Sequence, residues 1–127
     1  KTTIMNRIED VKSEWHEGKI PKDSATVPVV VLEAAVLLDA EWDDILDGVW
    51  VVKTPKEVAL QRLMETRGLS HDEAEKRIQA QQSRRGIGNL EEEIQNKVVT
   101  NVIENNGSLD DLRHALEDAL RDPKSWK

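Results

Sequence analysis

The stretch DGVWVVKTPKE, residues Asp47–Glu57, joins the two kinds of element that set the fold. Its first part, DGVWVV, is rich in β-branched residues and lacks polar alternation, which is typical of a strand buried on both faces of a parallel sheet. In the second part, Thr54 is positioned as a helix N-cap, Pro55 as the first helical residue and Glu57 as the partner in a capping box. A buried strand that leads directly into a helix predicts an α/β fold.

Two further apolar runs have the same character, VPVVVL at Val27–Leu32 and VVTNVI at Val98–Ile103, and each predicts another buried strand. Helical spacing and capping residues predict helices near the start of the chain, over 55–67, and after Ser70 and Ser108. The segment GKIPKDSAT, residues 18–26, predicts a loop, and the final RDPKSWK predicts a tail. The chain is therefore expected to form a single domain, residues 1–127, with three parallel strands flanked by helices.

Composition limits the partners and the compartment. The chain has 25 acidic residues against 18 Lys and Arg, a net charge of -7, which argues against binding to nucleic acid or to an anionic membrane. It has no cysteine and only three scattered histidines, so neither a disulfide nor a zinc site is expected. No apolar run is long enough to span a bilayer. We expect a cytoplasmic protein, or a mitochondrial one in a eukaryote, and an N-terminus at Lys1 that results from a cut.

Positive charge is concentrated in EKRIQAQQSRRGIG, residues Glu75–Gly88. Gln81 follows Arg77 by four positions, and Arg84 and Arg85 follow Gln81 by three and four, so these side chains share one side of a helix. Guanidinium groups bind phosphate oxygens through two parallel hydrogen bonds. Two interpretations stay open: an anion-binding site, or a solvated helix end whose arginines complement the helix dipole.

Four stretches, taken in order along the chain, carry a resemblance to a known family. They are VVLEAAVLLDAEW at 30–42, DGVWVV at 47–52, LQRLMETRGLSHDEAEKRIQAQ at 60–81 and NVIENNG at 101–107. Together they resemble the signatures of the dephospho-coenzyme A kinase family. The third is the most specific, because Arg62, Arg67, Arg77 and Gln81 fall at the spacing of that family's lid. AAVLLDAEW is similar to the kinase half of eukaryotic bifunctional coenzyme A synthases.

The resemblance implies a partial P-loop kinase fold in which residues 55–97 form a helical lid. Members of the family use ATP with Mg²⁺ to phosphorylate the ribose 3'-hydroxyl of dephospho-CoA, in the last step of coenzyme A biosynthesis. By this resemblance the residues expected to act in catalysis are Arg67 and Arg77. The residues expected to contact ATP from the lid and its surroundings are Arg62, Gln81, Arg84, Arg85 and Asn105. The residues expected to border dephospho-CoA are Glu33, Leu37, Leu38 and Trp42.

Glu33 has a second expected role, as an indirect ligand of the metal. It closes the apolar run VVVLE at the carboxyl end of a predicted strand, the layout by which P-loop proteins direct a carboxylate toward Mg²⁺ or its water. The simpler interpretation, in which Glu33 stabilises the N-terminus of the turn that follows, is equally open. The glycine-rich loop with its lysine, which would decide between them, does not occur in these residues.

The chain also departs from the family pattern. The family's phosphate-binding loop, first strand and expected catalytic aspartate all precede the matched region, so the complete enzyme is expected to be active and this polypeptide alone inactive. Asn101 stands where the family usually has an aspartate. Residues 86–97 resemble an insertion, and its acids Glu91–Glu93 would be able to fold back onto the arginines and neutralise them.

A second function of a different class is left open. The chain would then be a degenerate, non-catalytic kinase domain that acts as a binding or oligomerisation module through an exposed sheet edge. The partners are dephospho-CoA and ATP in the first case, and a second copy or another protein in the second. A glycine-rich loop ending in Lys and Ser or Thr, upstream in the reading frame, would distinguish the two.

Overall fold

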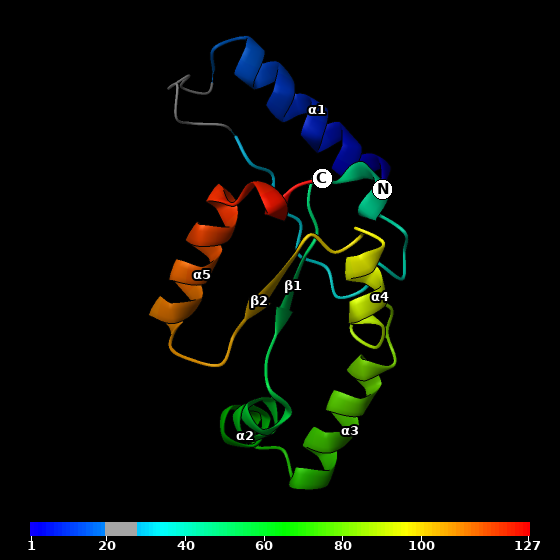
Figure 1. Ribbon diagram of the computed structural model, residues 1–127, viewed down its shortest axis with the longest axis vertical. Helices are drawn as coiled ribbons and strands as arrows, with labels where there is room; N and C mark the ends of the chain where they lie inside the picture. Colours follow the sequence, from blue (N-terminus) through cyan, green and yellow to red (C-terminus); the bar gives the residue numbers. More distant parts are fainter. Residues whose placement is uncertain (20–27) are drawn as a thin grey trace. The chain divides into compact units, whose positions relative to one another are not determined.

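The computed structural model describes residues 1–19 and 28–127 (Figure 1). Most of the predicted loop at 18–26, and Val27 of the first predicted strand, lie outside the described residues. The chain divides into two compact units, Lys1–Leu37 and Leu38–Lys127, and each is described by itself. The expectation of one domain over the whole chain stays a prediction.

Helix α1 of the first unit spans Thr2–His16. Ile4, Ile8 and Val11 follow one another at four and three residues, which places them on one side of the helix, and all three are half-buried. No helix in the part of the chain that the structure describes is long and apolar enough to cross a membrane.

The first predicted strand does not form, and this prediction is wrong. Its described residues, 28–32, are assigned to neither strand nor helix, and a turn follows at 35–41. Val29, Val30 and Val31 are 50%, 38% and 82% exposed, although their composition is that of a buried strand. A strand is held by ladder hydrogen bonds to a neighbour, and the described residues provide no strand that pairs with this run.

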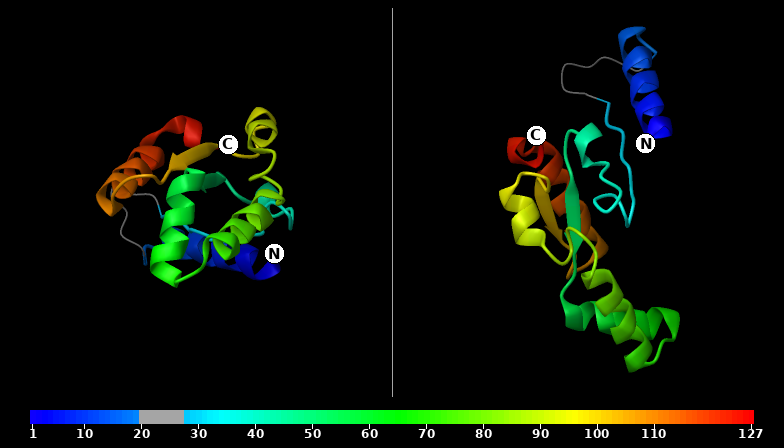
Figure 2. Two further views of the ribbon diagram at one scale, coloured as in Figure 1. Left: turned by 90° about the horizontal axis from the view of Figure 1, so that it is seen from below. Right: turned by 90° about the vertical axis from the view of Figure 1, so that its right-hand side faces the viewer.

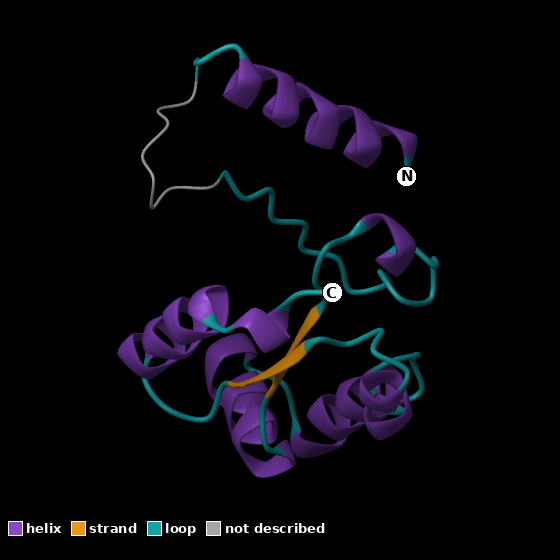
Figure 3. Cartoon of the chain, turned by 45° about the horizontal axis from the view of Figure 1, so that its top comes forward, coloured by secondary structure: helices purple, strands orange, loops and turns teal. Residues whose placement is uncertain are grey.

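The second unit contains a parallel sheet of two strands, β1 at Trp50–Lys53 and β2 at Asn101–Glu104. Two strands in these regions and a parallel sheet were predicted. The structure adds the register, with Trp50 opposite Asn101 and Lys53 opposite Glu104. Figure 3 shows the two strands among the helices of this unit, so the α/β class is confirmed with two strands in place of three.

Helices connect and flank the strands. The crossover from β1 to β2 contains three of them, α2 at Lys56–Arg67, α3 at His71–Gln82 and α4 at Leu90–Gln95. The views in Figures 1 and 2 place α2 and α3 beyond the carboxyl ends of the strands. After β2, α5 at Leu109–Arg121 packs against that strand, and two short 3-10 turns lie at Asp43–Ile45 and Pro123–Ser125. The core around the sheet includes Val49, Val99, Ile103 and Ala119, each no more than 5% exposed.

The predicted helix starts are confirmed at two of three places. The Ser108 hydroxyl accepts from the Asp111 amide at 3.1 Å, and the Asp111 carboxylate accepts from the Ser108 amide at 3.0 Å, which completes a capping box. The Ser70 hydroxyl accepts from the Glu73 amide at 3.2 Å. The predicted cap at Thr54 is wrong: α2 begins one residue later than that cap requires, with Pro55 in the N-cap position and no side-chain cap bond.

The C-terminal tail is part of the core and not a free end. Ser125 is fully buried, and its carbonyl oxygen accepts hydrogen bonds from Trp50 Nε1 at 3.0 Å and from Thr100 Oγ1 at 2.6 Å. Asn101 Nδ2 donates to Ser125 Oγ at 2.7 Å, and the rings of Trp50 and Trp126 meet edge to face at 5.4 Å. The tail therefore holds the amino ends of both strands, with the half-buried Trp50 in contact with Trp126.

Candidate functional site

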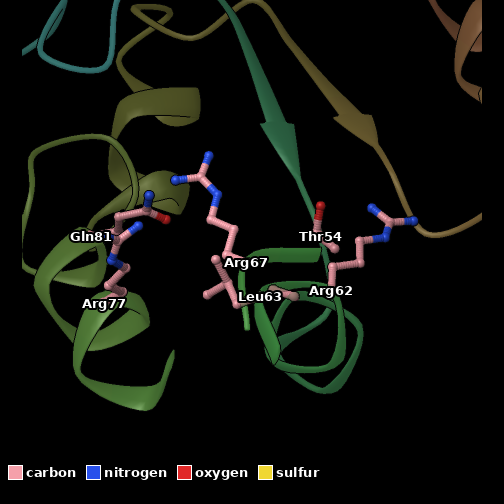
Figure 4. Close-up of a pocket in the computed structure, with 7 residues that line it drawn as sticks. Thr54, Arg62, Leu63, Arg67, Arg77 and Gln81 are labelled. Carbon is pink, nitrogen blue, oxygen red and sulfur yellow. The ribbon is translucent and has the colours of Figure 1, made fainter. Parts of the chain in front are cut away.

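A pocket lies at the carboxyl end of β1, with walls from α2 and α3 (Figure 4). Its cavity volume is about 260 Å³. Ligands in open α/β folds bind at the carboxyl ends of the parallel strands, so this is the position expected for a ligand site. The side chains that carry its chemistry are Thr54, Arg62, Leu63, Arg67, Arg77 and Gln81.

The two helices position these side chains through local sequence features. Gly68 follows α2 with φ of 63°, the left-handed conformation that glycine adopts without strain, and the chain can then turn into α3. On α3, Ala74 and Ile78 are 0% and 8% exposed and face the interior. Arg77 and Gln81, one turn apart, both line the pocket.

A surface ion pair also connects the two helices. Lys56 Nζ of α2 lies 3.1 Å from Glu75 Oε1 of α3. The hydrogen bond and the charge of Lys56 lower the pKa of Glu75 below its ordinary value. Both side chains are partly exposed, so the pair contributes little to stability but favours this arrangement of the helices.

The pocket has a concentrated positive charge. Three arginines and no acidic residue line it. Within the described residues, Arg67 and Arg77 have neither a hydrogen-bond nor an ion-pair partner, and both side chains are exposed to solvent. Uncompensated guanidinium groups that converge on one cavity favour an anion with several oxygens, above all a phosphate chain.

Arg62 differs from the other two arginines. Its Nη1 donates to the carbonyl oxygen of Asn105 at 3.2 Å, and its Nη2 donates to that of Gly107 at 3.3 Å. Asn105 also donates its amide to the carbonyl of Lys53 at 2.7 Å. The structure thus brings Asn105 next to the pocket through its backbone.

Thr54 is a pocket residue that the sequence analysis did not assign to the site. It directly follows β1, and in Figure 4 it lies between α2 and the strand. The sequence position of Thr54 could have indicated this role, because the residue after a buried parallel strand lies at the edge of the sheet where ligands bind. The capping motif gave Thr54 a competing role, and the structure shows that this role is not taken.

Arg84 and Arg85 do not line the pocket. Arg85 forms a two-pronged ion pair with Glu93, with Nε–Oε1 at 2.6 Å and Nη2–Oε2 at 3.3 Å, and its Nη1 donates to the Leu38 carbonyl at 3.0 Å. The hydrogen bond to Glu93 raises the pKa of Arg85. Among the described residues, Glu93 therefore neutralises Arg85, and no acidic residue lines the pocket.

The residues expected to border dephospho-CoA are divided between the two units. Glu33, which is exposed, and Leu37 belong to the first unit. Leu38 is 7% exposed and Trp42 is half-buried, and both belong to the second. The roles of these residues, and that of Arg84, stay predictions.

The residues described by the structure do not fit a resident metal ion by themselves. Over 1–19 and 28–127, no group of three or more His, Asp or Glu side chains gathers to hold one. The indirect metal role of Glu33 stays a prediction.

Comparison with known proteins identifies one family. A family model described as dephospho-CoA kinase matches residues 11–111. The dephospho-CoA kinase of Carboxydothermus hydrogenoformans is 36% identical over 129 aligned residues, which cover 100% of this chain and 58% of that protein. The one from Arabidopsis thaliana is 35% identical, covering 92% of this chain and 45% of its own length. The one from Geobacter sulfurreducens is 39% identical, and the alignment covers 72% of this chain and 43% of that protein.

This chain thus spans about half the length of these curated relatives. No solved structure is significantly similar to it.

Proposed function

The chain belongs to the dephospho-CoA kinase family, and on that premise we propose that its arginine pocket binds the phosphate groups of a nucleotide substrate. The complete protein would transfer a phosphoryl group from ATP to the ribose 3'-hydroxyl of dephospho-CoA. The observation that carries the proposal is the pair Arg67 and Arg77, which line one cavity with no acid in its wall.

Phosphoryl transfer depends on positioning and on neutralising the charge of the phosphate oxygens, which the protein achieves with fixed cations. Arg67 and Arg77 come from different helices, so together they would hold two sides of a phosphate chain. Gln81, one turn beyond Arg77, would donate its amide to the same ligand. Arg67 and Arg77 are therefore our candidates for the catalytic arginines.

Residues 55–97 would form the lid of a partial P-loop kinase fold. The helix pair α2 and α3, joined at Gly68, carries the pocket arginines and would close over the bound phosphates, excluding water. Arg85 would hold the base of this lid through Glu93 and would not bind phosphate. Glu33, Leu37, Leu38 and Trp42 would border dephospho-CoA, as the resemblance implies.

The 127 residues contain no glycine-rich loop ending in Lys and Ser or Thr. Because backbone amides of such a loop hold the triphosphate, this polypeptide alone should not catalyse the transfer and should bind ATP weakly. Mg²⁺, when bound to the phosphates, would neutralise part of their charge, and no step of the present proposal depends on a residue that holds it.

A second candidate function is a non-catalytic binding or oligomerisation module. The observation that favours it is the small sheet, because both strands of a two-stranded sheet are edge strands with unpaired backbone groups. A measurable tendency of the chain to dimerise, without any binding of nucleotides, would favour this alternative.

The experiment that tests the proposed function is a chemical-shift titration of the chain with ATP. Replacing Arg67 or Arg77 by alanine should raise the dissociation constant about tenfold, the effect of one charge-assisted hydrogen bond. Arg121→Ala is the matched control, since it removes the same charge from the exposed end of α5. Equal weakening by all three substitutions would contradict the proposal.

A further inference from the structure

Arg62 lines the phosphate pocket but uses its guanidinium elsewhere. Both terminal nitrogens donate to backbone carbonyls of one loop, at Asn105 and at Gly107. In Figure 4 its side chain points toward the loop after β2, away from Arg77 and Gln81. To grip a phosphate with the same two nitrogens, Arg62 would have to leave these two carbonyls without their donors.

The loop Asn105–Gly107 lies beside the pocket by strand register. Lys53 and Glu104 are partners in the parallel ladder, so the next residues, Thr54 and Asn105, leave the sheet side by side. The amide of Asn105 donates to the carbonyl of Lys53 at 2.7 Å, which keeps the start of the loop close to β1. Thr54 is itself a pocket residue. A ligand whose phosphates lie at Arg67 and Arg77 is therefore flanked by this loop.

We propose that Arg62 is a positioning residue, which acts through the Asn105–Gly107 loop on the nucleoside part of the ligand and does not bind its phosphates. This inference rests on the proposed function and deepens it, because it divides the arginines of the pocket into two roles. Arg67 and Arg77 bind the phosphate chain. Arg62, on the same helix as Arg67, holds the loop that lies next to the pocket.

Helix α2 couples the Asn105–Gly107 loop to the phosphate-binding part of the site. This helix carries Arg62 and Arg67 and is thus connected both to the loop and to the phosphates. A change in the position of α2 would move the Asn105–Gly107 loop and the bound phosphates together. The loop is then in place for the nucleoside when the phosphates are held.

Two probes separate the roles, ATP and inorganic tripolyphosphate, each titrated into the 127-residue chain and followed by chemical shifts. Arg62→Ala should weaken ATP binding about tenfold, while tripolyphosphate binding changes less than about twofold. Arg67→Ala should weaken both probes about equally. An Arg62→Ala variant that loses tripolyphosphate as strongly as Arg67→Ala would overturn the inference.

Arg62→Lys sharpens the test, because it keeps the positive charge but loses the planar fork that reaches two carbonyls at once. If Arg62 positions the loop, the lysine variant should bind ATP as poorly as the alanine variant. Recovery of ATP binding by lysine would mean that charge alone matters, and the inference would be wrong.

A ligand-free measurement distinguishes failure of the inference from failure of the proposed function. Arg62→Ala should accelerate hydrogen exchange at the Asn105 amide, which donates to Lys53, whereas Arg67→Ala should leave it unchanged. If the unaltered chain bound neither probe, the proposed function would fall. The exchange result would then decide by itself whether Arg62 holds the loop, and unchanged exchange in Arg62→Ala would refute that role.

Discussion

Arg85 and Glu93 form an ion pair in which both carboxylate oxygens accept from one guanidinium, at 2.6 Å and 3.3 Å. Glu93 is only 6% exposed, although it lies in the acidic run LEEE, which has the composition of a solvated helix face. The pair joins the segment that follows α3 to α4, and the Leu38 carbonyl accepts from the same guanidinium at 3.0 Å. The guanidinium of Arg85 is thus held in structural contacts away from the pocket.

Breaking this pair is expected to lower stability and to leave phosphate binding unchanged. Glu93→Gln and Arg85→Ala should each reduce the denaturant midpoint, since each leaves a charged or polar partner without its counterpart. In the double variant the loss should be smaller than the sum of the two, as direct contact requires. Additive losses in equilibrium unfolding would contradict the assignment.

In a longer protein that contains this chain and the family's phosphate-binding loop, Arg77→Ala should lower kcat about 100-fold or more. The reason is that the guanidinium of Arg77 would no longer neutralise the negative charge on the transferred phosphoryl group. Arg121→Ala, with the same loss of charge on α5, should leave kcat within about twofold. Steady-state kinetics with ATP and dephospho-CoA provide the measurement, and similar rates for the two variants would remove the catalytic role of Arg77.

Glycine is required at position 86 for two separable reasons. Gly86 is buried with φ of 85°, and a methyl group there would overlap the side chain of Leu38. Gly68 has a similar φ of 63°, but a methyl group there would meet no atom within 4 Å.

Gly68→Ala is therefore the matched control for backbone strain alone. It should cost about 1 kcal/mol, and Gly86→Ala about 2 kcal/mol or more in thermal or denaturant unfolding. Equal costs for the two substitutions would show that the contact with Leu38 is easily relieved.

The capping box of α5 should make stability depend on pH in the acid range. Hydrogen bonds from the backbone and hydroxyl of Ser108 lower the pKa of Asp111 below its ordinary 3.8. A carboxyl group with a lowered folded-state pKa stabilises the fold above its unfolded pKa, and the stabilisation is lost as the pH falls through the folded value.

Asp111→Asn should thus reduce stability at neutral pH and flatten its dependence on pH below about 4. Ser108→Ala should cost about 1 kcal/mol at neutral pH through loss of the cap. Identical pH profiles for Asp111→Asn and the unaltered chain, in denaturant titrations, would contradict this account.

Features with a local signal could be predicted from the sequence. The strands β1 and β2 were found because their β-branched runs contrast with the amphipathic segments around them, and Ser70 and Ser108 mark their helices by cap chemistry. The arginines at 62, 67 and 77 were expected together from the resemblance, and the pocket brings all three into its wall.

Features that depend on distant partners could not be predicted. The run at 28–32 has the composition of a strand, but composition does not supply a neighbouring strand. Ser125 is buried, and its carbonyl accepts hydrogen bonds from Trp50 and Thr100, which are distant in the sequence. No residue pattern in the tail predicts these contacts. The role of Glu93 likewise depends on where Arg85 lies.

The guanidinium NMR signals of Arg67 and Arg77 test the phosphate pocket most directly. Their Nε–Hε resonances should shift saturably, and with one dissociation constant, when tripolyphosphate or ATP is added to the chain, and should not respond to adenosine. The Arg121 signal should stay in place throughout. If Arg67 and Arg77 respond no more than Arg121, the pocket does not bind phosphate and the proposed function is wrong.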